Sequence, residues 1–368
     1  MMKIAQLTFN VYDNYGNMLQ KYALHRVLKR YADTVEVLWT NRDTFLPETW
    51  EWNWRQQLIG MFNFVEERRR FTFEVIRQNK FKEFNDRYIR TRYDIKSLED
   101  IADDYDYFVV GSDQVWNPEF SEEFFPGRFL SFAPKEKRIA YAASIAIPEI
   151  PEQFKNNMRE GISNMAHVSV REDVAAKIIE DLTGDAPPIV VDPSFLLTVD
   201  EWKEVAQKPS WLDEKYSKGY IFAYFLGEMP VNIKDISKEF QMPVINLLDT
   251  EVFNHYIIGP SEFLFLIANA SLIYTNSFHG TVFSIINSRP FVFCDFLKIG
   301  PTLGRLSRIY SLLEDFKLTE RKAIKQNNFR LTSPLEIDYS QSNLILTKER
   351  EKAKKFLDEA LGSARSEN

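Results

Sequence analysis

Short apolar runs alternate with helix-length segments along most of this chain, and this alternation restricts its fold more than any other feature. The runs are rich in β-branched residues, as the strands of buried parallel sheets are. They cover residues 3–9, 35–39, 107–110, 138–142, 168–170 and 189–191 in a first series, and 220–226, 243–248, 271–275 and 290–294 in a second. The sequence therefore predicts an α/β protein with two parallel-sheet domains.

The boundary between these domains is expected near residue 198. Pro193 ends the last strand pattern of the first series, and a new helical pattern begins near Asp200. A chain of 368 residues also exceeds the length at which a single core usually suffices. We expect a first domain at 1–197, a second at 198–335, and a tail at 336–368 whose surface helix can return to the first domain.

Residues 49–92 are predicted to form a helical insertion in the first domain. Their aromatic residues are interleaved with basic ones, a pattern found in helices that rest on membranes. The alternative, which we favour, is that the aromatic residues pack on the first domain, because acidic residues in the same block dilute its basic face. The aromatic residues are Trp50, Trp52, Trp54, Phe62, Phe64, Phe71, Phe73, Phe81 and Phe84; the basic ones are Arg68, Arg69, Arg70, Arg77, Lys80 and Lys82.

Composition excludes several classes of protein. The net charge of −7 disfavours a general nucleic-acid binder, which needs a concentrated basic surface. Cys294 is the only cysteine, so neither an intramolecular disulfide nor a cysteine zinc site is expected. The first residues run into a strand pattern without the features of a signal peptide, and no apolar run is long enough to span a bilayer. We expect a cytoplasmic protein, with contact at the inner face of the membrane if the insertion rests on lipid.

The most informative motif joins a predicted buried strand to a predicted helix at residues 271–286. His279 falls in the first turn of that helix, where free backbone N–H groups and the helix dipole favour an anion. The alternative is a histidine that only hydrogen-bonds to a neighbouring loop. We favour an anion site, to which Ser277, Gly280 and Thr281 also belong.

Two loops of the first domain follow strands in the position where α/β folds bind ligands. The first contains Asn14, Tyr15, Gly16 and Asn17, and glycine permits a close backbone approach. The second follows residues 109–111 and contains Asp113, with an amide and an indole nearby that suit a sugar. The alternative for both loops is ordinary helix capping. The further candidates of the second loop are Gln114, Asn117 and Trp116, the last as an apolar platform.

Three arginines are candidates for holding an anion. Arg171 follows a strand, where its guanidinium can bind a carboxylate or phosphate through two hydrogen bonds or pair with Glu172 or Asp173 instead. Arg305 and Arg308 lie on a predicted helix, where solvated surface charges are the commonest explanation. No phosphate-binding glycine motif, zinc-protease motif or nucleophile elbow is present, which disfavours kinases, simple dehydrogenases, zinc proteases and α/β-hydrolases. We expect neither a metal nor a cofactor.

Taken in order, four segments resemble the polysaccharide pyruvyl transferase family. They are Asn-Tyr-Gly-Asn-Met-Leu-Gln at 14–20, Gly-Ser-Asp-Gln-Val-Trp-Asn at 111–117, Val-Arg-Glu-Asp at 170–173 and Thr-Asn-Ser-Phe-His-Gly-Thr at 275–281, with support from 191–194 and 259–263. The resemblance implies a GT-B-like fold, in which two Rossmann-like domains face a cleft. It also implies transfer of the pyruvyl unit of phosphoenolpyruvate to a sugar during the synthesis of capsule, exopolysaccharide or cell-wall glycan.

The same resemblance assigns expected roles to residues. Arg171 and His279 match positions that hold phosphoenolpyruvate, whereas the better-described relatives have Arg-Leu-His where this chain has Ser277-Phe278-His279. Arg289, Arg305 and Arg308 are candidates to replace the missing arginine. We expect the phosphoenolpyruvate, a co-substrate, to lie against Arg171, His279 and the N–H groups after Gly280. His279 is then a clamp or acid, and Asp113 orients or deprotonates a hydroxyl of a sugar or lipid-linked oligosaccharide.

Two other functions remain open from the sequence. A nucleotide-sugar glycosyltransferase shares the two-domain architecture and places a diphosphate at a helix N-terminus. A non-catalytic glycan-binding or assembly protein would keep the fold and explain the absent arginine. The acceptor sugar and the oligomeric state are not determined by the residues.

Overall fold

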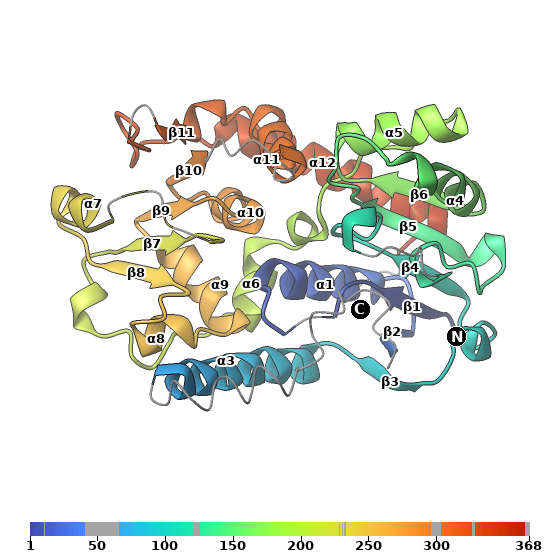
Figure 1. Ribbon diagram of the computed structural model, residues 1–368, viewed down its shortest axis with the longest axis horizontal. Coiled ribbons are helices and arrows are strands. Elements are labelled where there is room, and N and C mark those ends of the chain that lie inside the picture. The colour runs from blue at the N-terminus through green and yellow to red at the C-terminus, as the bar shows by residue number, and fades with distance from the viewer. Residues whose placement is uncertain are drawn as a thin grey trace.

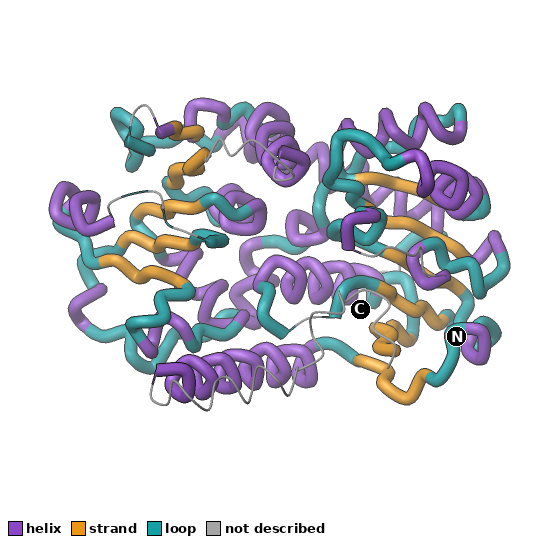
Figure 2. The backbone as a smooth tube through the Cα atoms, in the orientation of Figure 1, coloured by secondary structure: helices purple, strands orange, loops and turns teal. Residues whose placement is uncertain are grey.

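The computed structural model describes residues 1–10, 12–40, 66–120, 126–227, 229, 231, 233–295, 303–325 and 328–364. Within these ranges the chain forms two lobes, each built on a parallel sheet flanked by helices (Figures 1 and 2). The predicted α/β architecture with two parallel sheets is therefore confirmed.

The first sheet has the strand order β3-β2-β1-β4-β5-β6, and every neighbouring pair is parallel. This is the order of the Rossmann fold, in which the chain leaves β1 first toward one edge and then toward the other. The strands are β1 (Lys3–Leu7), β2 (Thr34–Thr40), β3 (Thr91–Ile95), β4 (Tyr107–Val110), β5 (Arg138–Ala143) and β6 (His167–Val170).

The second sheet has the order β11-β10-β9-β7-β8 and is also parallel. Counted within the lobe, this corresponds to the doubly wound order 2-1-3-4-5. The strands are β7 (Ile221–Tyr224), β8 (Val244–Leu247), β9 (Leu272–Thr275), β10 (Phe291–Asp295) and β11 (Lys322–Ile324).

Three strand predictions differ from the structure, all at sheet edges. The edge strands β3 and β11 were not expected: in β3 only Ile95 is buried, and β11 is three residues long. The expected strand at 189–191 is reduced to a single bridge between Ile189 and Val170, because two prolines precede it and Pro193 follows. The central strands, which are buried on both faces, agree with the prediction.

Helices connect the strands of both lobes. In chain order they are α1 (Tyr15–Leu28), α3 (Glu66–Tyr88), α4 (Glu152–Ser163), α5 (Asp173–Thr183), α6 (Val199–Val205), α7 (Ile233–Phe240), α8 (Phe253–Tyr256), α9 (Pro260–Asn269), α10 (Phe278–Ile286), α11 (Leu303–Asp315) and α12 (Ser340–Leu361).

Helix α1 occupies the centre of the molecule, between the two sheets (Figure 1). All of its residues except Arg26 are buried. It contacts α9 and α10 of the second lobe as well as the first sheet, and its apolar residues belong to the same core cluster as theirs. The two lobes therefore share a core around α1 and do not meet only at a polar surface.

Helix α3, the described part of the predicted insertion, also joins the lobes and runs along their underside in Figure 1. Phe81 packs on Tyr15 of α1, whereas Phe73 packs on Phe253 of α8 in the second lobe. Lys80 forms an ion pair with Glu262 of α9 at 2.7 Å. Phe81 therefore packs on the first domain as expected, whereas Phe73 packs on the second lobe; residues 49–65 of the predicted insertion lie outside the described residues.

The chain crosses to the second lobe after Asp192 and returns through its last helix. Helix α6 begins the second lobe. Thr198 caps this helix and exchanges hydrogen bonds with Glu201. In α12, Phe356 packs on Tyr141 of β5, and Asp358 accepts a hydrogen bond from Tyr31 at 2.9 Å. The C-terminal helix thus lies against the first lobe.

Each sheet reverses its winding between two central strands, and ligands of such folds bind outside the carboxyl ends of these strands. In the first sheet the reversal lies between β1 and β4, which are followed by the loops at 8–14 and 111–117. In the second it lies between β7 and β9, and the loop after β9 leads into α10. The motifs singled out in the sequence therefore stand at the two reversal points.

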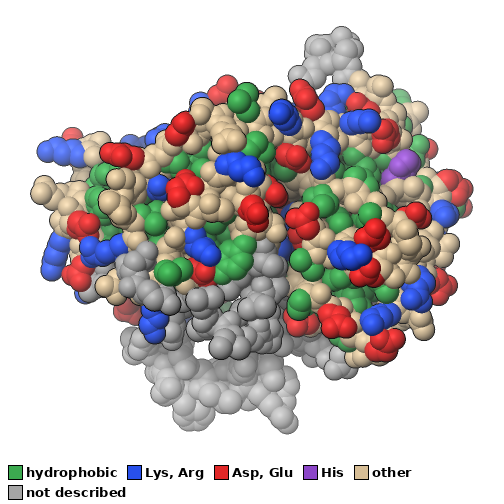
Figure 3. Space-filling model, turned by 90° about the horizontal axis from the view of Figure 1, so that it is seen from above, with side chains coloured by type: hydrophobic (Ala, Val, Ile, Leu, Met, Phe, Trp, Pro, Cys, Tyr) green, Lys and Arg blue, Asp and Glu red, His purple; other side chains and the backbone are tan. Residues whose placement is uncertain are grey.

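Viewed from above, basic and acidic side chains are interspersed over the surface, without one continuous basic region on this face (Figure 3). Among the described residues, none of the helices is both long and apolar enough to cross a membrane.

Candidate functional site

His279 is the second residue of α10, as the sequence predicts. The buried strand β9 ends at Thr275, whose hydroxyl donates to the carbonyl of Tyr224 at 2.7 Å and accepts from the N–H of Ser277 at 3.0 Å. Ser277 then caps the helix, its hydroxyl accepting from the N–H of Gly280 at 3.3 Å. These bonds fix the direction in which the imidazole leaves the second lobe.

The imidazole of His279 lies directly against the first lobe at Gly16. A Cβ atom added to Gly16 would stand 1.9 Å from Nδ1 of His279, so any larger residue would displace the ring. Both residues are buried, with His279 8 % exposed. The two most distinctive motifs of the sequence, at 14–20 and 275–281, therefore meet across the lobes.

A buried ion cluster surrounds the outer edge of this imidazole. Asp192 accepts a hydrogen bond from Nη1 of Arg171 at 2.7 Å, and its Oδ2 lies 3.7 Å from Nε2 of His279. Its Oδ1 accepts from the N–H of Ser194 at 2.9 Å. Burial opposes the ionisation of Asp192, but His279 and Arg171 outweigh it and hold its pKa below the ordinary value. Asp192 is therefore an anion that links a cation of the first lobe to the histidine of the second.

Arg171 is a permanently charged centre of this cluster. Burial opposes its charge, but the carboxylates of Asp192, Asp113 and Glu172 raise its pKa. Only the bond to Asp192 has hydrogen-bond length; the other two carboxylates lie at 3.6 Å from Nη2 and 3.7 Å from Nε. Within the described part of the chain, Nε and Nη2 are buried without a hydrogen-bond partner. Two guanidinium donors thus remain available to a ligand.

Arg308 of α11 lies, like Arg171, beside the ring of Phe278. The guanidinium carbons lie 4.7 Å (Arg171) and 5.6 Å (Arg308) from the ring centroid, and Nη1 of Arg308 lies 4.0 Å from Asp113. Arg308 is thereby the predicted replacement arginine that reaches the cluster. Arg289 lies beyond the opposite end of α10, and the side chain of Arg305 lies outside the described residues.

The N–H groups that α10 offers to an anion are not those expected from the sequence. The N–H of Gly280 is bonded to Ser277, and that of Thr281 donates to the carbonyl of Ser277 at 3.0 Å. In the described part of the structure, the N–H groups of Phe278 and His279 have no acceptor. The expectation of free N–H groups after Gly280 is therefore wrong, because the cap and the first helical turn use them.

Gly280 and Thr281 support the packing and capping of α10 and do not offer the expected contact to phosphoenolpyruvate. A Cβ atom on Gly280 would lie 2.3 Å from the hydroxyl oxygen of Thr275, so glycine allows α10 to pack on β9. The Thr281 side chain is fully buried and its hydroxyl donates to the carbonyl of Ser277 at 3.1 Å. Ser277 acts as the cap, and its short side chain stands where relatives have arginine.

The first-lobe loop at 14–17 is divided between surface and core. Asn14 is exposed and caps α1 by accepting from the N–H of Asn17 at 3.0 Å. Tyr15 is fully buried among Phe81, Phe263 and Tyr224, which contradicts its expected contact with an acceptor. The side-chain amide of Asn17 is also buried, but neither of its polar atoms has a partner among the described residues.

The loop after β4 contributes Asp113 to the cluster, but not the predicted platform. Trp116 is 0 % exposed, stacks on Phe129 and donates to the carbonyl of Arg128 at 2.9 Å. The expectation that it supports a sugar is therefore wrong: the indole is a core residue. Asn117 is buried and bonded to Gln114 and to the N–H of Glu119, which holds the loop, and Gln114 is partly exposed, as Asp113 is.

Asp192 and Phe278 are site residues to which the sequence interpretation gave no role. Both lie inside the motifs quoted above, at 191–194 and 275–281. In the sequence, Asp192 is only the residue before Pro193, which ends an apolar run. Its position between two basic groups becomes visible only in three dimensions.

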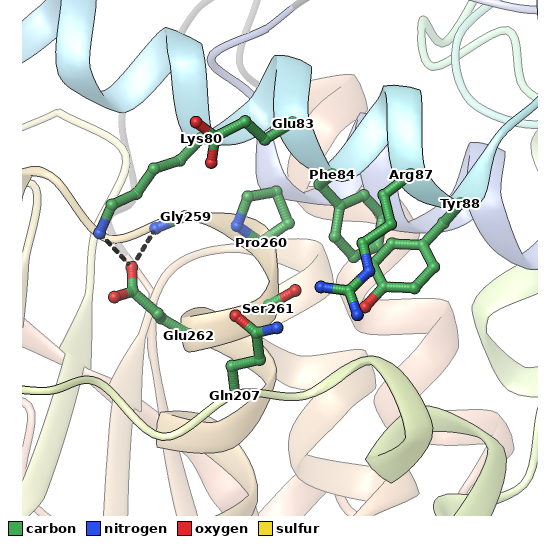
Figure 4. Close-up of a pocket in the computed structure, with 10 residues that line it drawn as sticks. All are labelled: Lys80, Glu83, Phe84, Arg87, Tyr88, Gln207, Gly259, Pro260, Ser261 and Glu262. Atoms are coloured by element: carbon green, nitrogen blue, oxygen red, sulfur yellow. Dashed lines mark hydrogen bonds and ion pairs between the residues drawn. The ribbon is translucent and has the colours of Figure 1, made fainter.

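A second cavity, of about 140 Å³, lies between α3 and α9, separate from this cluster (Figure 4). Lys80 and the N–H of Gly259 both point to the carboxylate of Glu262, at 2.7 and 2.9 Å. Arg87 extends over the cavity from an exposed position. Among the described residues no group of three or more His, Cys, Asp or Glu is arranged to hold a metal ion.

Comparison with known proteins gives one match to a family. A sequence model described as polysaccharide pyruvyl transferase matches residues 14–296, which include all four motifs. No curated protein matches the chain.

Several solved structures are similar in fold. A proposed UDP-N-acetylglucosamine 2-epimerase from Listeria monocytogenes covers 100% of this chain with 99% of its own, at a TM-score of 0.55 and 12% identity. The UDP-GlcNAc 2-epimerase from Neisseria meningitidis, bound to UDP-GlcNAc, covers 95% with 100% of its own, at 0.45 and 11%. A glycosyltransferase from Rickettsia africae covers 97% with 98%, at 0.46 and 12%. At 12% identity, the likeness to the Listeria monocytogenes protein shows the two-lobed, GT-B-like fold alone.

Proposed function

This chain belongs to the polysaccharide pyruvyl transferase family, and we propose that it transfers the pyruvyl group of phosphoenolpyruvate to a sugar. The sugar is part of a surface polysaccharide or of its lipid-linked precursor, the product is a pyruvate ketal, and inorganic phosphate is released. The observation that supports this proposal best is the meeting of Arg171 and His279, from different lobes, on the carboxylate of Asp192.

Phosphoenolpyruvate carries a carboxylate and a phosphate, and the cluster offers donors to both. Arg171 keeps two buried N–H donors, and the N–H groups of Phe278 and His279 add the positive end of a nine-residue helix. Arg308 supplies a second guanidinium beside the Phe278 ring. In this low-dielectric setting such groups stabilise an anion more than they would in water.

The proposed reaction needs one proton donor and one proton acceptor. Protonation of the C3 methylene of phosphoenolpyruvate makes C2 electrophilic, and a sugar hydroxyl attacks C2 while losing its proton. The bond from C2 to the phosphate oxygen breaks, and a second hydroxyl takes its place at C2. One of the two hydroxyl protons balances the proton taken up at C3 and the other leaves with phosphate. We assign His279 to the acid or clamp and Asp113 to the hydroxyl.

The test is release of inorganic phosphate from phosphoenolpyruvate in the presence of a panel of lipid-linked galactosides and mannosamine-containing glycans. His279→Ala should lower the rate by about 100-fold or more, as loss of a general acid or of an anion-stabilising donor does. His255→Ala is the matched control, because this second buried histidine accepts from the N–H of Asn246 and lies in α8. An unchanged rate in His279→Ala would remove its assigned role.

Thermal unfolding separates this proposal from a nucleotide-sugar glycosyltransferase. A ligand that binds only the folded state raises the midpoint of unfolding by mass action. We expect phosphoenolpyruvate to raise it and UDP or GDP not to. The reverse result would favour the glycosyltransferase, and glycan binding without a response to either donor would favour a non-catalytic protein.

A further inference from the structure

Lys21 of α1 is a buried cation without a carboxylate beside it. Its side chain is 0 % exposed, and none of the ion pairs among the described residues includes it. Its Nζ makes one long hydrogen bond, 3.4 Å to Oδ1 of Asn10. Burial lowers its pKa to about 7. An ammonium group has three donors, so two of them are unused in a place where unused donors are costly.

A second unused polar group lies on the same face of α1. Asn17 precedes Lys21 by four residues, which places the two side chains one helical turn apart. Both polar atoms of its amide are buried and lack a partner in the described part of the chain. Gly16, beside it, is the residue that touches His279. The amide of Asn17 and the amine of Lys21 therefore have polar atoms without a partner among the described residues, on the helix whose Gly16 touches His279.

Lys21 lies beside the ring of Trp39, and two further aromatic rings contact Trp39. Trp39 lies with its centroid 5.9 Å from Nζ, and Tyr12 stacks on Trp39 at 5.1 Å. Tyr93 lies 5.8 Å from Trp39 and is 44 % exposed, while Tyr12 and Trp39 are partly exposed. The hydroxyls of Tyr12 and Tyr93 lie 3.3 Å apart, and that of Tyr93 also bonds to Asn85 and Asp86, so these rings are held in place.

These residues lie at the carboxyl ends of neighbouring strands. Asn10 and Tyr12 follow β1, Trp39 is near the end of β2, and Tyr93 belongs to β3. We infer that Asn10, Tyr12, Lys21, Trp39 and Tyr93, here named the Lys21 subsite, bind the acceptor, and that this acceptor is a sugar carrying an acidic group. The inference rests on the proposed function and names the substrate class that the first lobe recognises.

The chemistry of the Lys21 subsite fits such a sugar better than it fits other ligands. A pyranose ring has apolar C–H faces that pack on aromatic rings and a polar edge of hydroxyl groups that needs donors and acceptors. Lys21 supplies unused donors, and the buried amide of Asn10 positions it, since its Nδ2 donates to the carbonyl of Leu38 at 3.1 Å and its Oδ1 accepts from Nζ of Lys21 at 3.4 Å. An acidic substituent would supply the charge that Lys21 lacks, and a buried cation is strongly compensated by one anion.

The experiment measures binding of two probes to the full chain: methyl β-D-glucuronide and methyl β-D-galactoside, by calorimetry or saturation-transfer NMR at pH 6.5. We expect the glucuronide to bind at least about tenfold more tightly, Lys21→Met to abolish this preference, and Trp39→Ala to weaken both probes by about tenfold. Trp211→Ala is the matched control, because this tryptophan is partly exposed but lies in the second lobe against Tyr216 and His255.

The inference is overturned if the two glycosides bind equally well, or if Trp39→Ala and Trp211→Ala have the same effect. Thermal unfolding of Lys21→Met and Trp39→Ala establishes that each variant is folded before binding is measured. The donor half of the proposed function is tested separately, because phosphoenolpyruvate should still raise the unfolding midpoint of Trp39→Ala and not that of Arg171→Met. Failure of one half therefore leaves the other measurable.

Discussion

Arg171 and Lys21 are both buried cations of the first lobe, yet their surroundings are opposite. Three carboxylates lie within 4 Å of Arg171, and they raise its pKa. Among the residues that the structure describes, no carboxylate is paired with Lys21, and burial lowers its pKa to about 7. The guanidinium is a fixed charge held in place by Asp192, whereas the amine changes its charge near neutral pH.

The difference indicates that the N-terminal turn of α1 and the turn that carries Lys21 bind different ligands. At the N-terminal end, the motifs of both lobes meet in a cluster whose charges are already balanced in part, as suits a small donor bearing several charges. One turn further along, the protein leaves a cation uncompensated, as suits a site whose ligand brings the missing charge. A group retained at a cost to stability is more informative about function than one whose interactions are complete.

Replacing Arg171 should give the largest effect. Arg171→Met leaves the buried carboxylates of Asp192 and Glu172 without this cation, which typically costs about 3–5 kcal/mol of folding stability. The loss of two guanidinium nitrogens from the proposed phosphoenolpyruvate site should lower phosphate release by about 1,000-fold. Urea unfolding and the phosphate assay measure the two effects.

The matched control for Arg171 is Arg321, which is also buried but donates to the backbone carbonyls of Phe291, Pro334 and Glu336 at 2.6–3.0 Å. Arg321→Met should be destabilised while its folded fraction keeps the wild-type rate. If the folded fraction of Arg321→Met lost as much activity as that of Arg171→Met, the loss in Arg171→Met would not indicate a role of the cluster in the reaction.

Gly16→Ala tests whether the contact between Gly16 of the first lobe and His279 of the second lobe is needed for activity. The added methyl group would stand 1.9 Å from Nδ1 of His279, so the imidazole must shift from its present position beside Asp192. We expect phosphate release to fall by about 10–100-fold, since small displacements of a catalytic group have effects of this size. Alanine favours a helix more than glycine does, so little stability should be lost elsewhere.

A double-variant comparison isolates this contact. If Gly16→Ala acts through the imidazole, it should have almost no further effect in a His279→Ala background. Equal effects of Gly16→Ala in both backgrounds would mean that the first-lobe loop acts independently of His279.

Most of the fold and part of the site were accessible from the sequence, for identifiable reasons. The segment from Ser271 to Ile286 is an apolar run, a cap and a second apolar run, so local patterns alone predict β9, α10 and the position of His279. The edge strand β3 has one buried residue, so no apolar pattern marks it. Its register is set by pairing with β2, which no local pattern records.

Side-chain burial was the least accessible property. Trp116 follows a polar loop and suggested a surface platform, but Arg128 and Phe129 lie over it from a later segment. The pairing of Asp192 with Arg171 and His279 depends on the packing of both lobes around α1. Contacts between residues far apart in the chain decide both cases.

Lys21→Met should stabilise the protein, in contrast to Arg171→Met. Burial depresses the pKa of Lys21 from 10.5 to about 7, so between these values the unfolded chain binds more protons than the folded one. The stability of the wild type therefore rises with pH across this window, by at most about 1.4 kcal/mol per pH unit from this group. His25, one turn further on α1, stays neutral there because burial lowers its pKa to about 3.

Lys21→Met lacks this dependence, so its advantage over the wild type should be greatest below pH 7, at about 2 kcal/mol, and should shrink toward pH 10. Urea unfolding of both proteins at pH 6, 7.5 and 9 measures it. A destabilised variant with no change across this range would show that Lys21 is a satisfied structural residue.

The smallest expected effect concerns Trp116 and sharpens the placement of the acceptor. Trp116→Phe removes the hydrogen bond to the carbonyl of Arg128 and a little volume, so it should cost about 1–2 kcal/mol of stability. The KM for the acceptor should stay within about twofold of the wild type, because the indole is enclosed by Phe129 and contacts no solvent. Trp39→Phe should show the opposite pattern, with little loss of stability and a raised KM, since its ring is partly exposed at the Lys21 subsite. If Trp116→Phe instead raised the KM without loss of stability, the loop after β4 would open during catalysis, and the indole would contact the acceptor as the sequence interpretation expected.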